Sequence, residues 1–425
     1  MTAVTGPAWV DTVVWWHLYP LGFVGAERTS AEHAEQGGEV VHRLPRVTGW
    51  LDYLLQLGAN GLLLGPVLAS TSHGYDTLDH YRVDPRLGDE DDLRELLAQA
   101  RAKGVRVAFD GVFNHVSEDH DIVRRALAAD ATPEDRAWLR WVGEYPRGFE
   151  GNLDLVELDL THPPVQDYVV EVMSHWLGAG VDAWRLDAAF APGADAWRPI
   201  LDRVRQRHPD AWILAEVIQG DYVDFVHRSG VHSVTQYELW KAVWSSLNDV
   251  NLHELAWALT RHADFGEVFV PQVFVGNHDT TRIATRITDG RHLGIAVALG
   301  LLLPGVPSVY AGDEQGFTGE KLDRPGGDDA LRPAFPDTPE ELAPFGADLL
   351  RQHQHLIHLR RTHSWLTTAR ATARDVTNGS AAIDLVGTGP GSPALTLGLN
   401  LTDQPVVLHT DRGELAVEPH GWALR

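Results

Sequence analysis

Four acidic side chains in this sequence stand at or just after the ends of short apolar runs, where predicted strands end. They are Asp110, Asp187, Glu216 and Asp279. Two histidines, His115 and His278, lie in the same short stretches, and Arg185 stands two residues before Asp187. Residues two apart in a strand share a face, so Arg185 and Asp187 should point in the same direction. Carboxylates gathered at one edge of a sheet would suit acid and base chemistry.

The surroundings of Glu216 favour one particular role. An acid at a strand end is often only a helix N-cap, which is the simpler interpretation of each of the three aspartates taken singly. Glu216 instead lies between the apolar residues 213–215 and 217–218, and apolar surroundings raise the pKa of a carboxyl group. Glycoside hydrolysis uses such a pair: a carboxylic acid that is protonated near neutral pH, and an ionised carboxylate beside it. In a retaining mechanism the two carboxyls lie about 5–5.5 Å apart.

The elements that must position these groups alternate between apolar strands and amphipathic helices. Residues 93–100, for example, carry a helical apolar stripe after the acidic turn 89–92. Such alternation is typical of parallel α/β folds. The predicted strands cover residues 13–20, 61–64, 105–110, 181–187, 212–216, 233–237, 273–275 and 307–310. Eight strand and helix pairs predict an α/β fold of the TIM-barrel type, a (β/α)8 barrel formed by residues 1–115 and 165–363.

Two segments break this alternation. Residues 116–164 contain Pro, Gly, aromatic and charged residues without a clear period, so we expect a short inserted domain B after the third strand. In residues 364–425 leucines alternate with polar residues, as at 395–401, and a turn at 411–413 follows. This pattern predicts a C-terminal antiparallel β domain of sandwich type.

Composition excludes several classes of function. The chain of 425 residues has 59 acidic and 35 basic side chains, a net charge of −24, which argues against nucleic acid or an anionic membrane as a partner. The chain contains no cysteine, which excludes disulfides, thiolate metal sites and cysteine nucleophiles. No apolar run is long enough for a membrane span, and residues 1–10 do not resemble a signal peptide, so we expect a cytoplasmic protein.

The sequence contains 15 tryptophans, whose flat rings either fill a core or support bound sugars. Trp176 and Trp184 lie within helix and strand patterns, and we expect them in the core. Trp141, in the inserted segment, is the better candidate for a ring that faces a sugar.

Four motifs, in order along the chain, resemble those of the α-amylase family, glycoside hydrolase family 13. They are residues 110–115 (DGVFNH), 180–187 (GVDAWRLD), 215–217 (AEV) and 275–280 (VGNHDT). The resemblance extends from the first predicted strand to the closing residues 419–424. One such motif would be weak evidence, whereas all four on the expected strands make the chain similar to this family.

The resemblance implies roles for particular residues. Asp187 would be the nucleophile that forms a covalent glycosyl-enzyme, Glu216 the general acid and base, and Asp279 the group that holds hydroxyls of the distorted sugar. Arg185 would keep Asp187 ionised, and Asp110 would orient Arg185. The other residues implied in substrate binding are Tyr75, Asp76, His115, His278 and Arg282, with Tyr75 as a stacking platform and the histidines as hydrogen-bond donors to the sugar.

Departures from the family pattern bear on metal binding and linkage. Starch-degrading relatives usually carry Lys-His shortly after the nucleophile, where this chain has Ala188-Ala189-Phe190, and an Asp-rich calcium loop is missing from residues 22–38. Asn114 is compatible with a structural calcium ion, but the usual ligand pattern is incomplete, so we expect no metal and no cofactor. Residues 116–164 resemble domain B of the neopullulanase and cyclomaltodextrinase branch. Relatives specific for α-1,6 bonds tend to carry Val at the position of Ala188.

The resemblance therefore implies a retaining α-glycoside hydrolase that cleaves α-1,4 bonds, with some tolerance of α-1,6 bonds, in short or cyclic maltooligosaccharides. The partner would be an α-glucan oligosaccharide, and the oligomeric state stays open. A transglycosylase or isomerase, such as a glucanotransferase or a trehalose-forming enzyme, could use the same covalent intermediate. A non-catalytic sugar-binding member is a third alternative, but such members usually lose the catalytic acids that this chain keeps.

Overall fold

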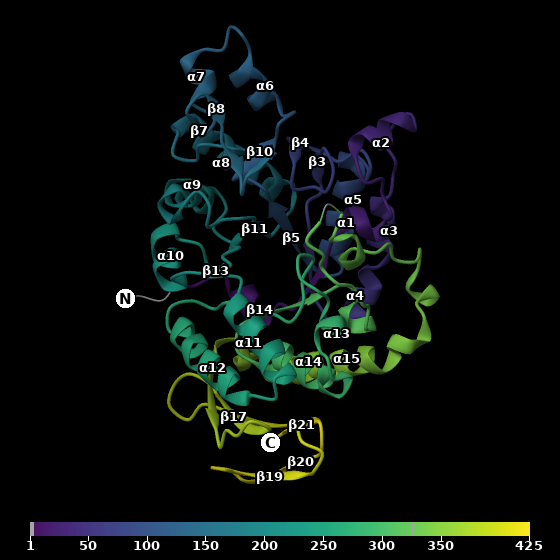
Figure 1. The fold of residues 1–425 in the computed structure, drawn as a ribbon, viewed down its shortest axis with the longest axis vertical. Coiled ribbons are helices and arrows are strands. Elements are labelled where there is room, and N and C mark those ends of the chain that lie inside the picture. The colour runs from purple at the N-terminus through teal and green to yellow at the C-terminus, as the bar shows by residue number, and fades with distance from the viewer. Residues whose placement is uncertain (1–3, 325) are drawn as a thin grey trace.

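The computed structural model describes residues 4–324 and 326–425, and its centre is a barrel of eight parallel strands (Figure 1). The strands are β1 (Trp15–Leu18), β2 (Gly61–Leu64), β5 (Arg106–Gly111), β11 (Ala183–Leu186), β12 (Trp212–Ala215), β13 (Ser233–Val234), β14 (Gln272–Phe274) and β15 (Val306–Tyr310). Neighbouring strands pair in parallel, and a bridge between Thr235 and Gln272 closes the barrel between β13 and β14. The predicted (β/α)8 fold is confirmed.

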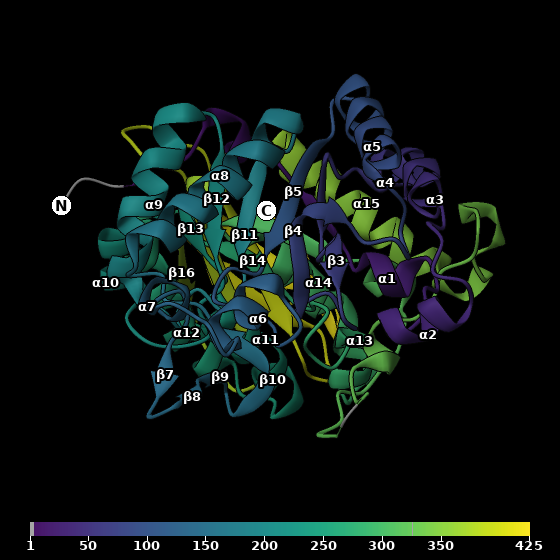
Figure 2. The same ribbon diagram turned by 90° about the horizontal axis from the view of Figure 1, so that it is seen from above.

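Helices surround the barrel, as Figure 2 shows from above. The longer ones are α5 (Glu90–Ala102), α8 (Pro163–Ala179), α9 (Ala194–Arg207), α10 (Tyr222–Ser229), α11 (Tyr237–Asn248), α12 (Leu252–Gly266), α14 (Leu293–Leu302) and α15 (Ala347–Thr362). The shorter ones are α1 (Pro20–Phe23), α2 (Ser30–Glu35), α3 (Leu44–Gly49), α4 (Leu51–Leu57), α6 (Asp121–Leu127), α7 (Pro133–Arg136) and α13 (Ile283–Arg286). Helix α5 begins at a capping box formed by Asp89 and Asp92, which satisfies backbone N–H groups of its first turn.

The structure differs from the predicted elements at the sixth strand. The strand expected over 233–237 ends at Val234, because α11 begins at Tyr237 with Gln236 as its N-cap. The Gln236 side chain accepts a hydrogen bond from the N–H of Leu239 at 3.3 Å. Glutamine is not among the common N-cap residues, so the sequence carried no clear helix signal there.

The inserted segment forms a small antiparallel sheet at the top of Figure 1. Its strands are β6 (His115–Ser117), β9 (Gly148–Phe149) and β10 (Asn152–Glu157), beside the hairpin of β7 (Trp141–Val142) and β8 (Tyr145–Pro146). His115 therefore both ends the third barrel unit and begins this sheet. Trp141 lies in β7 with the Arg136 guanidinium 3.8 Å from the centre of its ring, and its exposure to a sugar stays a prediction.

The C-terminal segment is an antiparallel β domain that packs below α12 and α14 (Figure 1). A four-stranded sheet contains β16 (Arg370–Arg374), β17 (Ser380–Val386), β18 (Ala394–Asn400) and β21 (Gly421–Leu424). The hairpin of β19 (Val406–Thr410) and β20 (Gly413–Val417) covers one face of this sheet. Gly398 is required there, because a Cβ atom at this position would lie 2.7 Å from the Val417 side chain.

Tryptophans make up half of the twelve largest fully buried side chains of the described residues. Trp15 stacks on Trp212 inside the barrel with ring centres 5.8 Å apart, and Trp16 stacks on Trp50 between barrel and helices. Trp176 and Trp184 are both buried, as predicted for core residues. In the described part of the chain, no helix combines the length and apolar character needed to cross a membrane.

A buried ion pair fixes the hairpin of β3 (Leu68–Ser70) and β4 (Thr77–Val83), whose loop carries Tyr75. Asp84 accepts from Nε and Nη2 of Arg86 at 2.9 and 2.7 Å, and from the backbone N–H and hydroxyl of Ser70 at 3.1 and 3.0 Å. Both charged side chains are almost fully buried. The pair therefore ties the two ends of the hairpin together beneath the loop.

Removing one member of this pair should be strongly destabilising. We expect Asp84→Ala to lower the free energy of unfolding by about 3–5 kcal/mol, because it leaves the Arg86 charge buried without its partner. Urea unfolding followed by tryptophan fluorescence measures the change. Asp52→Ala is the matched control: Asp52 pairs with Lys103 at the surface and should matter little. Equal effects of the two substitutions would contradict this assignment.

Candidate active site

The barrel brings the predicted strand-end residues together at one rim. Strand register pairs Asp110 of β5 with Arg185 of β11, and β11 pairs in turn with β12. Asp187 and Glu216 come directly after β11 and β12. Because the carboxyl ends of parallel barrel strands meet at the same face, their side chains converge.

The Arg185 guanidinium contacts all three of these carboxylates. Its Nη1 atom donates to both oxygens of Asp110, at 2.6 and 2.7 Å, and to Oδ1 of Asp187 at 3.3 Å. Its Nη2 atom lies 2.6 Å from Oε1 of Glu216. Since Arg185 is only 3% exposed, these charges attract one another with little screening by water. One buried cation therefore positions the predicted nucleophile and the predicted acid.

The ionisation of Asp187 responds to the charges around it. Burial, and then the charge of Glu216, raise the pKa of Asp187 well above its usual value, while Arg185 acts in the opposite direction. The neighbouring carboxylate thus disfavours the charged form of Asp187, and the guanidinium favours it.

Further donors orient the Glu216 carboxylate. Its Oε2 accepts from the backbone N–H of Ala188 at 3.0 Å, and its Oε1 accepts from the Tyr237 hydroxyl at 3.2 Å. The Tyr237 oxygen accepts in turn from Nδ2 of Asn277 at 2.8 Å. Ala188 has a φ of 44°, a left-handed conformation uncommon for a residue with a side chain. Sequence reasoning missed Tyr237, because it begins a helix that lies outside every motif.

Tyr75 is held from several sides. Its hydroxyl donates to Oδ2 of Asp110 at 2.9 Å and also contacts Nε2 of His278. Its ring lies parallel to the His278 ring, with the centres 5.3 Å apart. Nε2 of His115 lies 3.0 Å from its backbone carbonyl. The predicted platform is thus fixed at the rim, beside the carboxylates.

The two predicted histidines are buried and contact protein groups. Burial lowers the pKa of His115 to about 4, so its ring is neutral, and the hydrogen-bond network assigns the proton to Nε2, which faces the Tyr75 carbonyl. Nε2 of His278 lies 2.9 Å from Oδ2 of Asp279, and its Nδ1 lies 3.2 Å from Nε2 of His17. In this structure both rings position neighbouring residues, and their contact with a sugar stays a prediction.

Asp279 has the most open side chain of the predicted catalytic residues, at 30% exposed. Besides the His278 contact, its Oδ1 accepts from Nη2 of Arg332 at 2.9 Å. Burial would raise the pKa of Asp279, but His278 and Arg332 together hold it well below its usual value. Asp279 is therefore an ionised acceptor at the open side of the site. Arg332 was not predicted, because it lies in a loop outside every strand.

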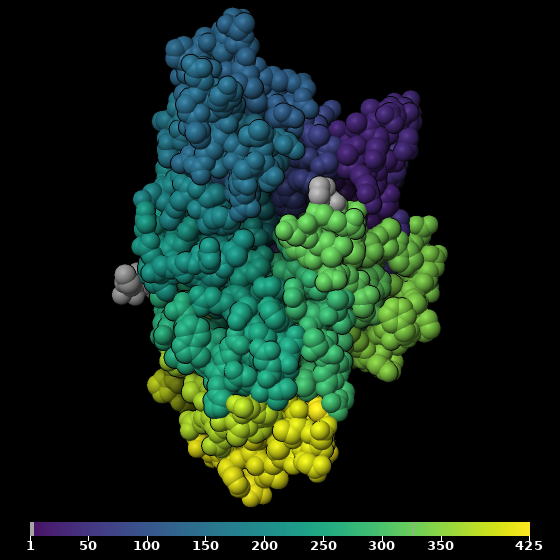
Figure 3. Space-filling model, in the orientation of Figure 1, coloured from purple at the N-terminus to yellow at the C-terminus, as the bar shows by residue number. Residues whose placement is uncertain are grey.

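Arg332, which contacts Asp279, also lines a cleft of about 1290 Å³. Tyr19 lines the same cleft, with the Arg332 guanidinium 4.6 Å from the centre of its ring. Asn152 of the inserted sheet and Lys321 contribute to its wall. Figure 3 shows the surface hollowed between the inserted domain, in blue, and the purple N-terminal segment that contains α2.

Two further predicted substrate contacts are buried and have protein partners. Arg282 is 1% exposed, and its guanidinium donates to Oδ1 of Asp313 and to the carbonyls of Ala311 and Leu331. Asp76 accepts from the Ser72 hydroxyl at 2.6 Å, within the loop that carries Tyr75. The contact of these two residues with a substrate stays a prediction.

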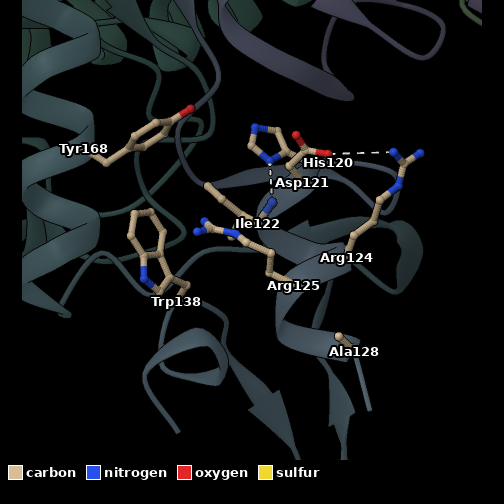
Figure 4. A pocket seen from close by; sticks show the side chains of 8 residues that line it. All are labelled: His120, Asp121, Ile122, Arg124, Arg125, Ala128, Trp138 and Tyr168. Atoms are coloured by element: carbon tan, nitrogen blue, oxygen red, sulfur yellow. Dashed lines mark hydrogen bonds and ion pairs between the residues drawn. The ribbon is translucent and has the colours of Figure 1, made fainter. Parts of the chain in front are cut away.

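A separate hollow of about 640 Å³ lies between the inserted segment and helix α8 (Figure 4). Its lining includes Arg125, whose guanidinium lies 5.7 Å from the centre of the Trp138 ring, and Tyr168 of α8. None of the predicted catalytic carboxylates is among its lining residues. None of them lines the cleft of 1290 Å³ either, but Arg332, which contacts Asp279, does, and this contact connects that cleft with the site.

Comparison with known proteins gives relatives along most of the chain. A cyclomaltodextrinase of Geobacillus thermopakistaniensis is 28% identical over 383 residues, which cover 84% of this chain and 63% of that protein. An intracellular maltogenic amylase of Bacillus subtilis is 27% identical and covers 74% of this chain and 57% of its own length. The chain thus spans about three fifths of the length of these two relatives.

Solved structures show the same fold. The cyclic α-maltosyl-(1→6)-maltose hydrolase from Arthrobacter globiformis superimposes with a TM-score of 0.84 at 24% identity, covering 99% of both chains. A debranching enzyme from Nostoc punctiforme gives a TM-score of 0.83 at 24% identity and equal coverage. At this identity the likeness concerns the fold alone.

The family model described as the alpha-amylase catalytic domain matches residues 32–152 and 149–354, which is more than half of the chain. This range contains all four strand-end motifs. With the eight-stranded barrel and the carboxylates gathered around Arg185 at its rim, the match shows that this chain belongs to the alpha-amylase family.

Proposed function

We propose that this protein is a retaining glycoside hydrolase that cleaves α-glucosidic bonds through a covalent intermediate on Asp187. The observation that carries the proposal is the buried cluster in which Arg185 contacts Asp187 and Glu216 together. Two carboxyls held by one guanidinium in a site of restricted water access suit this chemistry.

The first step of the reaction follows from this arrangement. Glu216 donates its proton to the glycosidic oxygen while the Asp187 carboxylate attacks the anomeric carbon, so the bond between that carbon and the leaving sugar breaks. The positive charge that develops on the sugar ring favours the ionised form of Asp187, and the proton then belongs to Glu216. Asp279, ionised beside Arg332, accepts hydrogen bonds from sugar hydroxyls.

The second step returns the site to its starting state. Glu216, now ionised, takes a proton from a water molecule, whose oxygen attacks the anomeric carbon and releases Asp187. Two displacements restore the original α configuration. Tyr75, fixed by Asp110 and stacked on His278, offers a flat face to the sugar ring.

We further propose short or cyclic maltooligosaccharides as substrates, with α-1,4 bonds preferred and α-1,6 bonds tolerated. The support comes from the two relatives, which are named as a cyclomaltodextrinase and a maltogenic amylase. A cleft of about 1290 Å³ beside Asp279 has room for several sugar units.

Substitution of either carboxyl of the pair should abolish most activity. We expect Asp187→Asn and Glu216→Gln each to lower kcat on maltotriose by about 10³-fold or more, because each removes a group that acts in the transition state. Asp195→Asn and Glu254→Gln, which change surface carboxyls of α9 and α12, are the matched controls. Near-normal turnover of either active-site variant would exclude the assigned roles.

Arg332 should control the ionisation of Asp279. The Arg332 charge lowers the pKa of Asp279, so Arg332→Gln should raise this pKa and move the acid limb of the kcat/KM profile to higher pH. We also expect kcat/KM at its optimum to fall by about 10- to 100-fold, since Asp279 loses its fixed position. Lys321→Gln, in the same cleft, is the control. An acid limb that does not move in Arg332→Gln would refute this role.

Product analysis tests the reaction type. Incubation with maltotriose, panose or a cyclodextrin, followed over time by chromatography, should yield only smaller or linearised sugars if water resolves the intermediate. Retention predicts that the newly formed reducing ends appear first as the α anomer, which proton NMR detects. Products longer than the substrate, or isomerised ones, would instead identify a transglycosylase or isomerase.

A further inference from the structure

A group of metal-binding residue types lies outside the active site, where the barrel meets the C-terminal domain. Asp289 and His292 stand just before helix α14, and His420 lies in the turn before β21. Helix α14 and strand β21 are in contact in the lower part of Figure 1. One potential ligand atom from each of the three residues lies within 4.8 Å of the others.

The two imidazole rings face each other nitrogen to nitrogen. Nε2 of His292 lies 3.0 Å from Nδ1 of His420. Nε2 of His420 lies 2.8 Å from Oδ1 of Asp403, and an ionised carboxylate can only accept, so this nitrogen carries a proton. When the ring holds only this proton, Nδ1 of His420 directs a lone pair at His292.

His292 is buried, and its Nδ1 atom makes no well-formed hydrogen bond among residues 4–324 and 326–425, although the backbone carbonyl of Leu247 lies near the ring. If the ring proton sits on Nε2, it satisfies the contact with His420 but leaves a buried acceptor without a donor. If it sits on Nδ1, where the Leu247 carbonyl can accept it, two lone pairs meet across 3.0 Å. The protein atoms alone therefore do not satisfy this histidine pair.

A metal ion between the rings would resolve the second arrangement. Zinc binds histidine nitrogens at about 2.0–2.1 Å, so two nitrogens on one ion lie about 3 Å or slightly more apart. A bridging proton would use only the two rings, whereas a metal ion also uses the third potential ligand, Asp289. The Asp289 side chain is 35% exposed and can turn toward the ion.

The surrounding charges favour a cation. Arg291 contacts Asp289 and Asp403, at 2.7 and 3.1 Å, so two carboxylates and one guanidinium leave a net negative charge beside the two rings. The contact of Asp403 with His420 is the arrangement in which an outer carboxylate fixes the tautomer of a metal-binding histidine.

We propose that Asp289, His292 and His420 bind a divalent transition-metal ion of the zinc type, with Asp403 orienting His420. The ion would link the start of α14 in the barrel to the last turn of the C-terminal domain. It lies outside the catalytic rim, so it would act on stability rather than on the glycosidic chemistry.

The test uses the full chain after dialysis against a chelator. Titration with Zn²⁺ by calorimetry should show one bound equivalent, and Zn²⁺ should raise the unfolding temperature. Co²⁺ should give visible absorption bands with nitrogen ligation. His420→Gln should lose binding, and Asp403→Asn should weaken it by about 10- to 100-fold. Because Asp403 is largely exposed, this second variant should fold normally.

The control variant is His42→Gln, which changes the other three-residue group that could hold a metal, formed with Asp89 and Asp92 near α5. It should bind Zn²⁺ as the parent chain does. The proposal is overturned if the parent chain binds no Zn²⁺, if His420→Gln and Asp403→Asn bind it unchanged, or if binding is lost in His42→Gln.

Discussion

The active site depends on the buried guanidinium of Arg185. Asp110, Asp187 and Glu216 come from three neighbouring strands, and without a cation their charges would repel one another in a site with little water. Arg185 contacts all three, so the rim tolerates carboxylates that the chemistry needs. Its position follows from strand register, which places it opposite Asp110. The barrel therefore fixes the pairing of β5 with β11, which holds Arg185 beside Asp110.

Loops add the parts that face a substrate. Tyr75 reaches the site on the β3–β4 hairpin, which the buried Asp84 and Arg86 pair holds from below. Arg332 reaches Asp279 from a loop after β15. Strands hold the groups that must not move relative to one another, while loops line the cleft in which the proposed substrate would lie.

The acidic excess of the chain belongs mostly to its surface. The carboxylates with a proposed chemical role are few, and Asp187 and Glu216 are buried. Many others form exposed pairs with arginine, such as Asp195 with Arg228. Pairs of this kind contribute little to stability. The net charge of −24 is therefore compatible with a neutral carbohydrate substrate and excludes little beyond polyanionic partners.

Much of the fold was predictable because its signals are local. Apolar runs of strand length and helical stripes mark the barrel units, and β2 coincides with the predicted residues 61–64. The predictions failed where the signal was weak, as at the Gln236 cap of α11. The strand-end acids were also predictable, because a barrel collects its strand ends at one face.

The sequence by itself determined the barrel, the family resemblance and the candidates Asp187, Glu216 and Asp279. Only the tertiary structure showed that Tyr237 and Arg332 contact these groups. It also showed that Arg282 contacts the buried Asp313 and that His292 contacts His420. Arg332 lies 53 residues from Asp279, and His292 lies 128 residues from His420. Contacts at such separations depend on how helices and loops pack, and no periodic pattern along the chain encodes them.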